Sequence, residues 1–374
     1  MSSPISVTIM TGSFADATSR VCDRLLQATT NQRVTAILPK RSRKKSRVID
    51  GVSIVSTTER LMRLGEGCAC CTVRSDLMTK VQKIAEDKTA DHIVIQALPQ
   101  SDLRTLAKTF TVADRSGAVL SEVARIEGFV SVIDVGKFLE KLQTSAGRAQ
   151  IESIELANVI VVTGGSGVPS AVFDQALGVI AAVNPTARVE RADEKSFSLA
   201  SLGVQEPFKL DVAEQRAMDV GVSPQNSEAT SSVTRFVYQA RRPFHPARLH
   251  AVLNGSLDGV IRAQGSFWVA TRPEFVRKLD LAGGTRESSC TGMWWATVPE
   301  GQRPDSLEFK QYAASIWHPE YGDRHQALSF VGVGLDEANI RALLDECLLN
   351  EQELVDPEVW ATMQDPFDWP EMSQ

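Results

Sequence analysis

Short runs of apolar residues recur through the first half of this chain, and each has the length of a buried strand. They are His92–Ile95, Phe129–Ile133 and Val159–Val162, and they follow Ile5–Met10, which alternates and is rich in β-branched residues and so also predicts a strand. Segments with helical periodicity, such as Ala17–Leu26, lie between them. Strands buried on both faces are continuously apolar, and helices connect such strands in parallel sheets. The alternation therefore predicts an α/β fold, with a parallel sheet covered by helices on both faces.

The chain has 374 residues, which is long for one ordinary domain. The alternating pattern extends over residues 1–204. Residues 205–232 are rich in Ser, Gln, Glu and Asp and lack an apolar period, so we expect a linker there. Strand and helix patterns resume in residues 233–374, including a strong helical period over Glu337–Leu349. This second region predicts a smaller α+β domain.

The composition excludes several classes of protein. A net charge of −6 argues against binding of polyanions by the whole surface. No run approaches the roughly 18 to 20 apolar residues of a membrane span, and the first residues do not resemble a signal peptide. Six cysteines without an export signal suit a reducing compartment. We therefore expect a cytoplasmic protein that engages neither DNA nor a membrane.

Half of the cysteines fall within four residues, at Cys68, Cys70 and Cys71. Thiolates are soft ligands that suit zinc, and their close spacing favours a shared ion over a disulfide. The apolar spacing after Val73 predicts a helix directly beyond the cluster, and a helix N-terminus just after Thr72 would lower the pKa of the thiols. Glu66 is a weaker candidate ligand. The alternative is a buried turn that holds no metal.

The cysteine segment resembles the signature of the CobW-like GTPases and zinc metallochaperones. Other blocks resemble the same family in the same order: Val132-Ile133-Asp134, Asn184-Pro185-Thr186-Ala187-Arg188, Arg241–Pro246, Gly265–Pro273 and Asp365-Pro366-Phe367. These blocks span nearly the whole chain. The resemblance implies a domain like that of the P-loop NTPases, followed by a smaller α+β domain like the CobW C-terminal domain.

The family's phosphate loop, G-x-x-x-x-G-K-[ST], is degenerate here. In such a loop the backbone N–H groups cradle phosphates, the Lys neutralises them and the hydroxyl binds magnesium. Only Gly12 and Ser19 remain of the pattern. Thr18 stands in the place of the Lys, and Asp16 adds a charge that repels phosphate. Gly12, Thr18 and Ser19 therefore predict, at most, a weak phosphate site.

Two further GTPase motifs are also lost. Gln96 replaces the acidic residue at a strand end, and Pro99 replaces a glycine and removes a backbone N–H. Ser166 stands where the guanine-reading Asp of the N-K-x-D motif would be, and a serine cannot reproduce that bidentate pairing. These losses favour a pseudo-GTPase, so we do not expect GTP and magnesium as cofactors.

A basic segment takes the place of an acidic one in the family. Six of the nine residues from Pro39 to Arg47 are cationic: Lys40, Arg41, Arg43, Lys44, Lys45 and Arg47. Such a run can be a solvated loop, but it also has the charge that contact with a nucleic acid backbone requires. We hypothesise contact with RNA, on a ribosome.

Three interpretations of function follow. The first is a non-catalytic, zinc-responsive factor that binds the ribosome or ribosomal RNA. It is similar to the family branch that includes the protein Y recruitment factor, which would imply recruitment of a hibernation-factor protein under zinc limitation. The alternative is a GTP-dependent zinc metallochaperone that delivers metal to a client protein. The third is a degenerate paralogue that only binds another protein.

Overall fold

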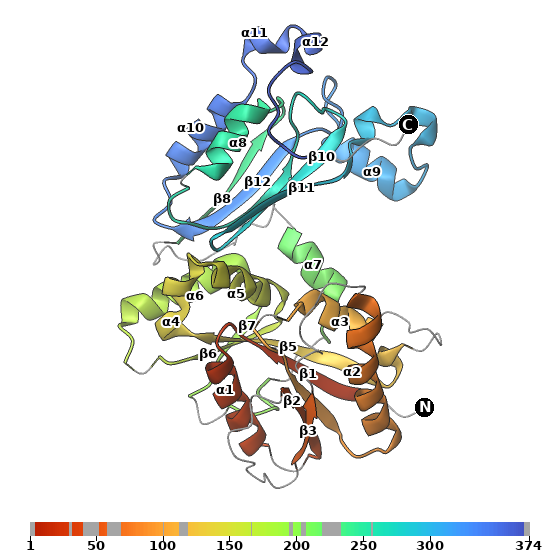
Figure 1. The fold of residues 1–374 in the computed structure, drawn as a ribbon, viewed down its shortest axis with the longest axis vertical. Helices are drawn as coiled ribbons and strands as arrows, with labels where there is room; N and C mark the ends of the chain where they lie inside the picture. The colour runs from red at the N-terminus through yellow and green to blue at the C-terminus, as the bar shows by residue number, and fades with distance from the viewer. Residues whose placement is uncertain are drawn as a thin grey trace. The chain divides into compact units, whose positions relative to one another are not determined.

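The computed structural model describes residues 4–29, 32–39, 52–57, 69–99, 101–111, 119–165, 167–193, 197–202, 207–218, 233–255 and 257–369. The chain divides into two compact units, which we call unit 1 (Met1–Ala217) and unit 2 (Met218–Gln374). Each unit has its own sheet (Figure 1). Within the described part of the chain, we find no helix with the length and apolarity needed to span a bilayer.

Unit 1 is built on a seven-stranded sheet in which every pairing is parallel. The strands are β1 (Ile5–Thr11), β2 (Val34–Pro39), β3 (Val52–Thr57), β4 (His92–Gln96), β5 (Ala124–Asp134), β6 (Val159–Thr163) and β7 (Arg188–Arg191). Their order in the sheet is β3-β2-β4-β1-β5-β6-β7. The apolar runs and the alternating segment Ile5–Met10 found in the sequence form the adjacent strands β4, β1, β5 and β6. The predicted parallel α/β sheet is confirmed.

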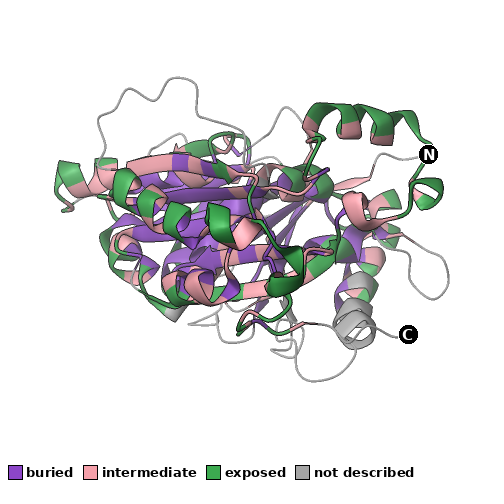
Figure 2. Cartoon of the chain, turned by 90° about the horizontal axis from the view of Figure 1, so that it is seen from above, coloured by how far each residue is buried: buried purple, intermediate pink, exposed green. Residues whose placement is uncertain are grey.

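Helices cover both faces of this sheet (Figure 1). The helices are α1 (Ala15–Gln27), α2 (Ala69–Glu86), α3 (Leu103–Thr111), α4 (Val135–Leu142), α5 (Ser145–Leu156), α6 (Ser170–Val183) and α7 (Leu210–Met218), with a short 3-10 turn η3 (Leu120–Glu122). Across the chain, the buried residues gather on the strands and on the helix faces that meet them, while the outer faces of the helices are exposed (Figure 2). On one face, Val21 and Leu25 pack with Met10 in a shared core. On the other face, Val7 and Ile9 share a core with apolar residues of four other helices, α2, α3, α5 and α7. Neighbouring residues of β1 belong to different cores because successive side chains of a strand point to opposite faces of the sheet.

Unit 2 is an α+β domain, as expected, and its sheet is antiparallel. Its strands are β8 (Val233–Ala240), β9 (Val260–Phe267), β10 (Phe275–Ala282), β11 (Thr285–Met293) and β12 (Gln326–Val333), in the order β11-β10-β9-β12-β8. Helices α8 (Pro246–Asn254) and α10 (Glu337–Cys347) lie side by side over one face (Figure 1). Leu249, Ile340 and Leu344 share a core with Phe330 of the sheet. The remaining elements are α9 (Leu307–Ile316), α11 (Glu351–Leu354), α12 (Pro357–Trp360), η4 (Trp295–Thr297) and η5 (Glu300–Gln302).

The end of unit 1 lies further along the chain than the sequence analysis placed it. Residues 205–232 were expected to be a linker, but α7 lies within this range and belongs to unit 1. The ring of Phe208 packs 5.0 Å from that of Phe129. Arg216 donates to the carbonyl of Glu155 at 2.7 Å and to Thr186 Oγ1 at 2.8 Å. These contacts attach α7 to the sheet domain.

The turn Asn184-Pro185-Thr186-Ala187 has a structural role that explains its composition. Asn184 is buried, and its amide nitrogen donates to the carbonyls of Ile154 and Ala157 at 2.7 and 2.8 Å. Its side-chain oxygen accepts from the backbone N–H of Ala187 at 3.1 Å. One side chain thereby satisfies buried polar groups at the end of α5 and in the turn before β7.

Candidate functional site

The loop that leads from β1 into α1 consists of Gly12, Ser13 and Phe14 alone, because α1 begins at Ala15. A phosphate loop of the G-x-x-x-x-G-K-[ST] type needs its backbone N–H groups directed at the phosphates. Here the N–H of Thr18, at the position of the family's Lys, donates to the carbonyl of Phe14 at 3.0 Å. The residues that would form the second half of the cradle are an ordinary helical turn.

The chain itself fills the space beneath this loop. Thr18 is fully buried, and its hydroxyl donates to the Phe14 carbonyl at 3.1 Å. A Cβ added to Gly12 would lie 2.5 Å from the carbonyl oxygen of Val132 and 2.6 Å from Thr18 Oγ1. Gly12 is therefore required here by close packing of the loop against β5. Ser13 Oγ is buried without a hydrogen-bond partner.

The two positions that would hold magnesium in this type of fold are joined directly. Gln96, the last residue of β4, is 2% exposed. Its side-chain amide donates to Ser19 Oγ at 2.8 Å. The sequence analysis identified the retained Ser19 and the replacement at Gln96 but missed this contact. The available signal was that a hydroxyl was kept at position 19 while the acid at position 96 became an amide.

Charged groups surround the loop. Arg20 lies on α1 with its guanidinium 3.8 Å from a carboxylate oxygen of Asp134, the last residue of β5. The ammonium of Lys137 sits 5.5 Å from the centre of the Phe14 ring. These cations flank the β1–α1 loop, and each already contacts a group of the chain.

The end of β6, where a guanine would be read, is also closely packed. Gly164 adopts a φ of +79°, and a Cβ there would lie 2.8 Å from a carboxylate oxygen of Asp134. The guanidinium of Arg191 stacks 5.0 Å from the centre of the Phe173 ring. A Cβ on Gly165 would lie 3.1 Å from that ring. Ser166 lies outside the described residues.

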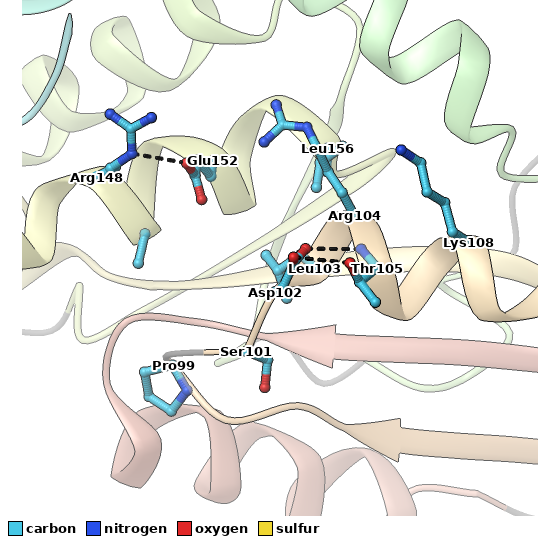
Figure 3. A pocket seen from close by; sticks show the side chains of 11 residues that line it. Pro99, Ser101, Asp102, Leu103, Arg104, Thr105, Lys108, Arg148, Glu152 and Leu156 are labelled. Atoms are coloured by element: carbon cyan, nitrogen blue, oxygen red, sulfur yellow. Dashed lines mark hydrogen bonds and ion pairs between the residues drawn. The ribbon is translucent and has the colours of Figure 1, made fainter. Parts of the chain in front are cut away.

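The connection from β4 to α3 is held by its own hydrogen bonds. The N–H of Ala97 donates to the carbonyl of Met10 at 2.8 Å, and that of Leu98 donates to Ser101 Oγ at 3.1 Å. Asp102 accepts from the backbone N–H and the hydroxyl of Thr105 at 2.8 and 2.9 Å, and so caps α3. Figure 3 shows both bonds.

A polar pocket of about 550 Å³ lies between this connection and α5 (Figure 3). Its basic residues are Arg104, Lys108 and Arg148. Arg148 bonds Glu152 at 3.1 Å, and Arg104 lies 3.5 Å from Glu214. The sequence analysis did not identify this pocket, because its residues come from the β4–α3 connection, α3 and α5, which share no motif.

The cysteine cluster lies at the start of α2. The helix begins at Ala69, so the backbones of Cys70 and Cys71 belong to its first turn. We expected the helix to begin just after Thr72, and that expectation was wrong by about one turn. Ala69 favours helix, and the helix extends N-terminally beyond the apolar stripe that revealed it. The residues of that stripe, Leu77, Val81 and Ile84, are buried in the core of unit 1, as predicted.

Several predicted site residues cannot be placed. Cys68, Glu66 and the basic residues Lys40, Arg41, Arg43, Lys44, Lys45 and Arg47 lie outside the described residues. The side chains of Cys70 and Cys71 lie outside them too. Among the residues that are described, no group of three or more metal-ligating side chains occurs. The other three cysteines are free thiols: Cys22 and Cys347 are buried, and Cys290 is partly exposed.

Comparison with known families identifies both units. The family described as CobW/HypB/UreG, nucleotide-binding domain, matches residues 7–190. The cobalamin synthesis protein CobW C-terminal domain matches residues 233–348. The chain therefore consists of a CobW/HypB/UreG nucleotide-binding domain followed by a CobW C-terminal domain.

Similar proteins carry names that refer to zinc. The zinc-regulated GTPase metalloprotein activator 1 of Dictyostelium discoideum is 28% identical over 340 residues, which cover 83% of this chain and 70% of that protein. The zinc chaperone Rv0106 of Mycobacterium tuberculosis is 28% identical over 331 residues, or 84% of this chain and 81% of that protein. A solved structure of the Zn(II)-bound YjiA GTPase from E. coli aligns with 93% of this chain and 100% of its own, at 15% identity and a TM-score of 0.38.

Proposed function

We propose that this chain is a zinc-handling protein of the metallochaperone type that passes zinc to a protein partner without a GTP cycle at the family's phosphate loop. Its relatives named for zinc support the zinc part. One observation carries the rest: the three-residue loop after β1, beyond which the Thr18 N–H bonds the Phe14 carbonyl. The Thr18 amide, which would face a phosphate in the family's loop, is already used by a hydrogen bond of the helix.

The chemistry of the cysteine segment fits zinc. Cys68, Cys70 and Cys71 supply up to three thiolate ligands, the kind that zinc prefers. The first turn of α2 carries unpaired backbone N–H groups and the positive end of the helix dipole, both of which favour the thiolate over the thiol. Three thiolates leave one tetrahedral position for a ligand from elsewhere. A site with an open position suits transfer of the ion better than permanent retention.

The phosphate loop region does not fit a nucleoside triphosphate. At the position of the family's Lys stands Thr18, which carries no charge, is fully buried and is bonded to the backbone. Asp16, exposed in the first turn of α1, places a negative charge beside the loop. Each lost hydrogen bond to a charged phosphate forfeits about 1.5–3 kcal/mol. These features support a protein that does not turn over GTP.

The test is whether nucleotide changes zinc affinity. Zinc is titrated into the full-length protein in competition with a chromogenic chelator, with and without GTP and magnesium. We expect the two zinc affinities to agree within about twofold, because coupling between sites requires that both ligands bind. A change of tenfold or more would establish the GTP-dependent metallochaperone instead.

A second function, contact with ribosomal RNA, rests on the basic segment from Pro39 to Arg47. Replacing Lys44 and Lys45 together by Glu should weaken binding to ribosomes and flatten its dependence on salt, because fewer counterions are released. Co-sedimentation with ribosomes at several salt concentrations measures both effects. If this variant binds as the wild type does, the RNA proposal is wrong. If the wild type itself binds, a pull-down from the ribosomal fraction then asks whether a hibernation-factor protein is recruited.

A further inference from the structure

The bond between Gln96 and Ser19 replaces an arrangement that P-loop proteins build around an ion. In those proteins, the loop's Ser or Thr hydroxyl and an acidic residue at a neighbouring strand end hold Mg²⁺ between them. Here the Gln96 amide reaches Ser19 Oγ directly, at 2.8 Å. One hydrogen bond within the chain therefore joins α1 to the end of β4.

The sheet places Gln96 for this bond. Gln96 pairs with Met10 of β1 at the carboxyl end of the strands, one residue beyond the last pairing of β4 with β2. At 2% exposure its amide is shielded from water. A buried amide that loses its partner is destabilising, so the side chain is held where Ser19 can accept.

The residues after Gln96 are those that respond to nucleotide in a GTPase. There, contacts through the γ-phosphate and Mg²⁺ order the switch segments, and hydrolysis releases them. In this chain, Ala97 bonds Met10, Leu98 bonds Ser101, and Asp102 caps α3 through Thr105. The described part of this connection is thus ordered by groups of the protein.

The geometry points to a connection that is fixed without nucleotide: the Gln96–Ser19 bond holds the start of the β4–α3 connection in one arrangement, with or without GTP and magnesium. Gln96 is then a positioning residue that removes the nucleotide switch from this fold. The residues of the connection that line the adjoining pocket therefore keep the same positions with and without nucleotide. The inference rests on the proposed GTP-independent function and names the bond that makes it possible.

Hydrogen–deuterium exchange of the full-length protein tests this inference. In the wild type, peptides that contain Ala97, Leu98 and Thr105 should exchange at the same rate with and without GTP and magnesium. Gln96→Met keeps the length of the side chain but cannot donate, and should speed exchange of these amides about threefold to tenfold. Ser19→Ala removes the same hydrogen bond by changing its acceptor, which is only partly buried. This second variant is used if Gln96→Met does not fold. Thr29→Ala, which removes a hydroxyl at the far end of the same α1 region, should leave these rates unchanged.

Two results would overturn the inference. One is unchanged exchange in both Gln96→Met and Ser19→Ala. The other is a severalfold slowing of these wild-type amides when GTP and magnesium are added. The proposed function can fail separately: calorimetry that detects GTP binding, together with unchanged exchange at Ala97 and Leu98, would refute GTP independence and support the fixed connection.

Discussion

Replacing Cys68, Cys70 and Cys71 together by serine is expected to weaken zinc binding by more than about 100-fold, since losing only an outer partner of a ligand costs roughly 10–100-fold. A serine hydroxyl stays protonated near neutral pH and is a harder, poorer zinc ligand than a thiolate. Competition with a chromogenic zinc chelator at pH 7 measures the change. Folding is checked by the tryptophan fluorescence of unit 2 and by the circular dichroism of the whole chain.

The remaining cysteines supply the matched control. Cys290 lies partly exposed in β11 of unit 2, so Cys290→Ser should leave zinc affinity unchanged. Burial raises the pKa of the Cys22 thiol to about 12 and that of Cys347 to about 11, which keeps both thiols protonated at neutral pH. If the triple variant retained wild-type affinity, or if Cys290→Ser lost it, the cluster would not be the zinc site.

Lowering the pH from 7 to 4 is expected to destabilise unit 1 by up to about 3 kcal/mol through His92 alone. His92 opens β4, and its Nε2 lies 2.8 Å from Thr8 Oγ1. Burial lowers the pKa of His92 from 6.5 to about 4, and the charge of Glu127 opposes this shift only in part. The unfolded chain therefore takes up a proton where the folded chain does not. This contribution to stability is complete above about pH 6.5 and is lost as the pH falls towards 4.

Two features of the sequence make this effect measurable. His92 is the only histidine of unit 1, and all six tryptophans belong to unit 2. Urea unfolding followed by exchange of the β1 and β4 amides reports on unit 1, while tryptophan fluorescence reports on unit 2. His92→Gln should reduce the loss of unit 1 stability over this pH range and leave unit 2 unaffected. Equal pH dependence of unit 1 in the wild type and in His92→Gln would contradict the assignment.

The central strands were predictable because both of their faces are buried, which leaves a continuous apolar run in the sequence. The strand β7 gave no such signal, since Arg188–Arg191 is a charged and largely exposed edge strand. The helix α7 was hidden in a polar stretch, and only tertiary contacts such as those of Phe208 and Arg216 attach it to unit 1. Local composition does not encode such contacts.

The sequence also indicated which motif positions had changed, but it did not indicate which contacts the new residues make in the fold. Gln96 and Ser19 are 77 residues apart, so their hydrogen bond follows only from the sheet and the start of α1. The three-residue loop after β1 was likewise not evident, because Ala15–Thr18 can be either loop or helix by composition. The charge of the basic segment was readable, but its place in the fold lies outside the described residues.

The central claim is that this CobW-type nucleotide-binding domain does not hold a triphosphate at its β1–α1 loop. The most direct test is calorimetric titration of GTP with magnesium into the zinc-loaded and the zinc-free full-length protein. We predict no saturable heat up to millimolar GTP in either state, since Thr18 and Gln96 bind other groups of the chain. Saturable, magnesium-dependent binding at micromolar GTP, lost on Gly12→Ala, would contradict the account.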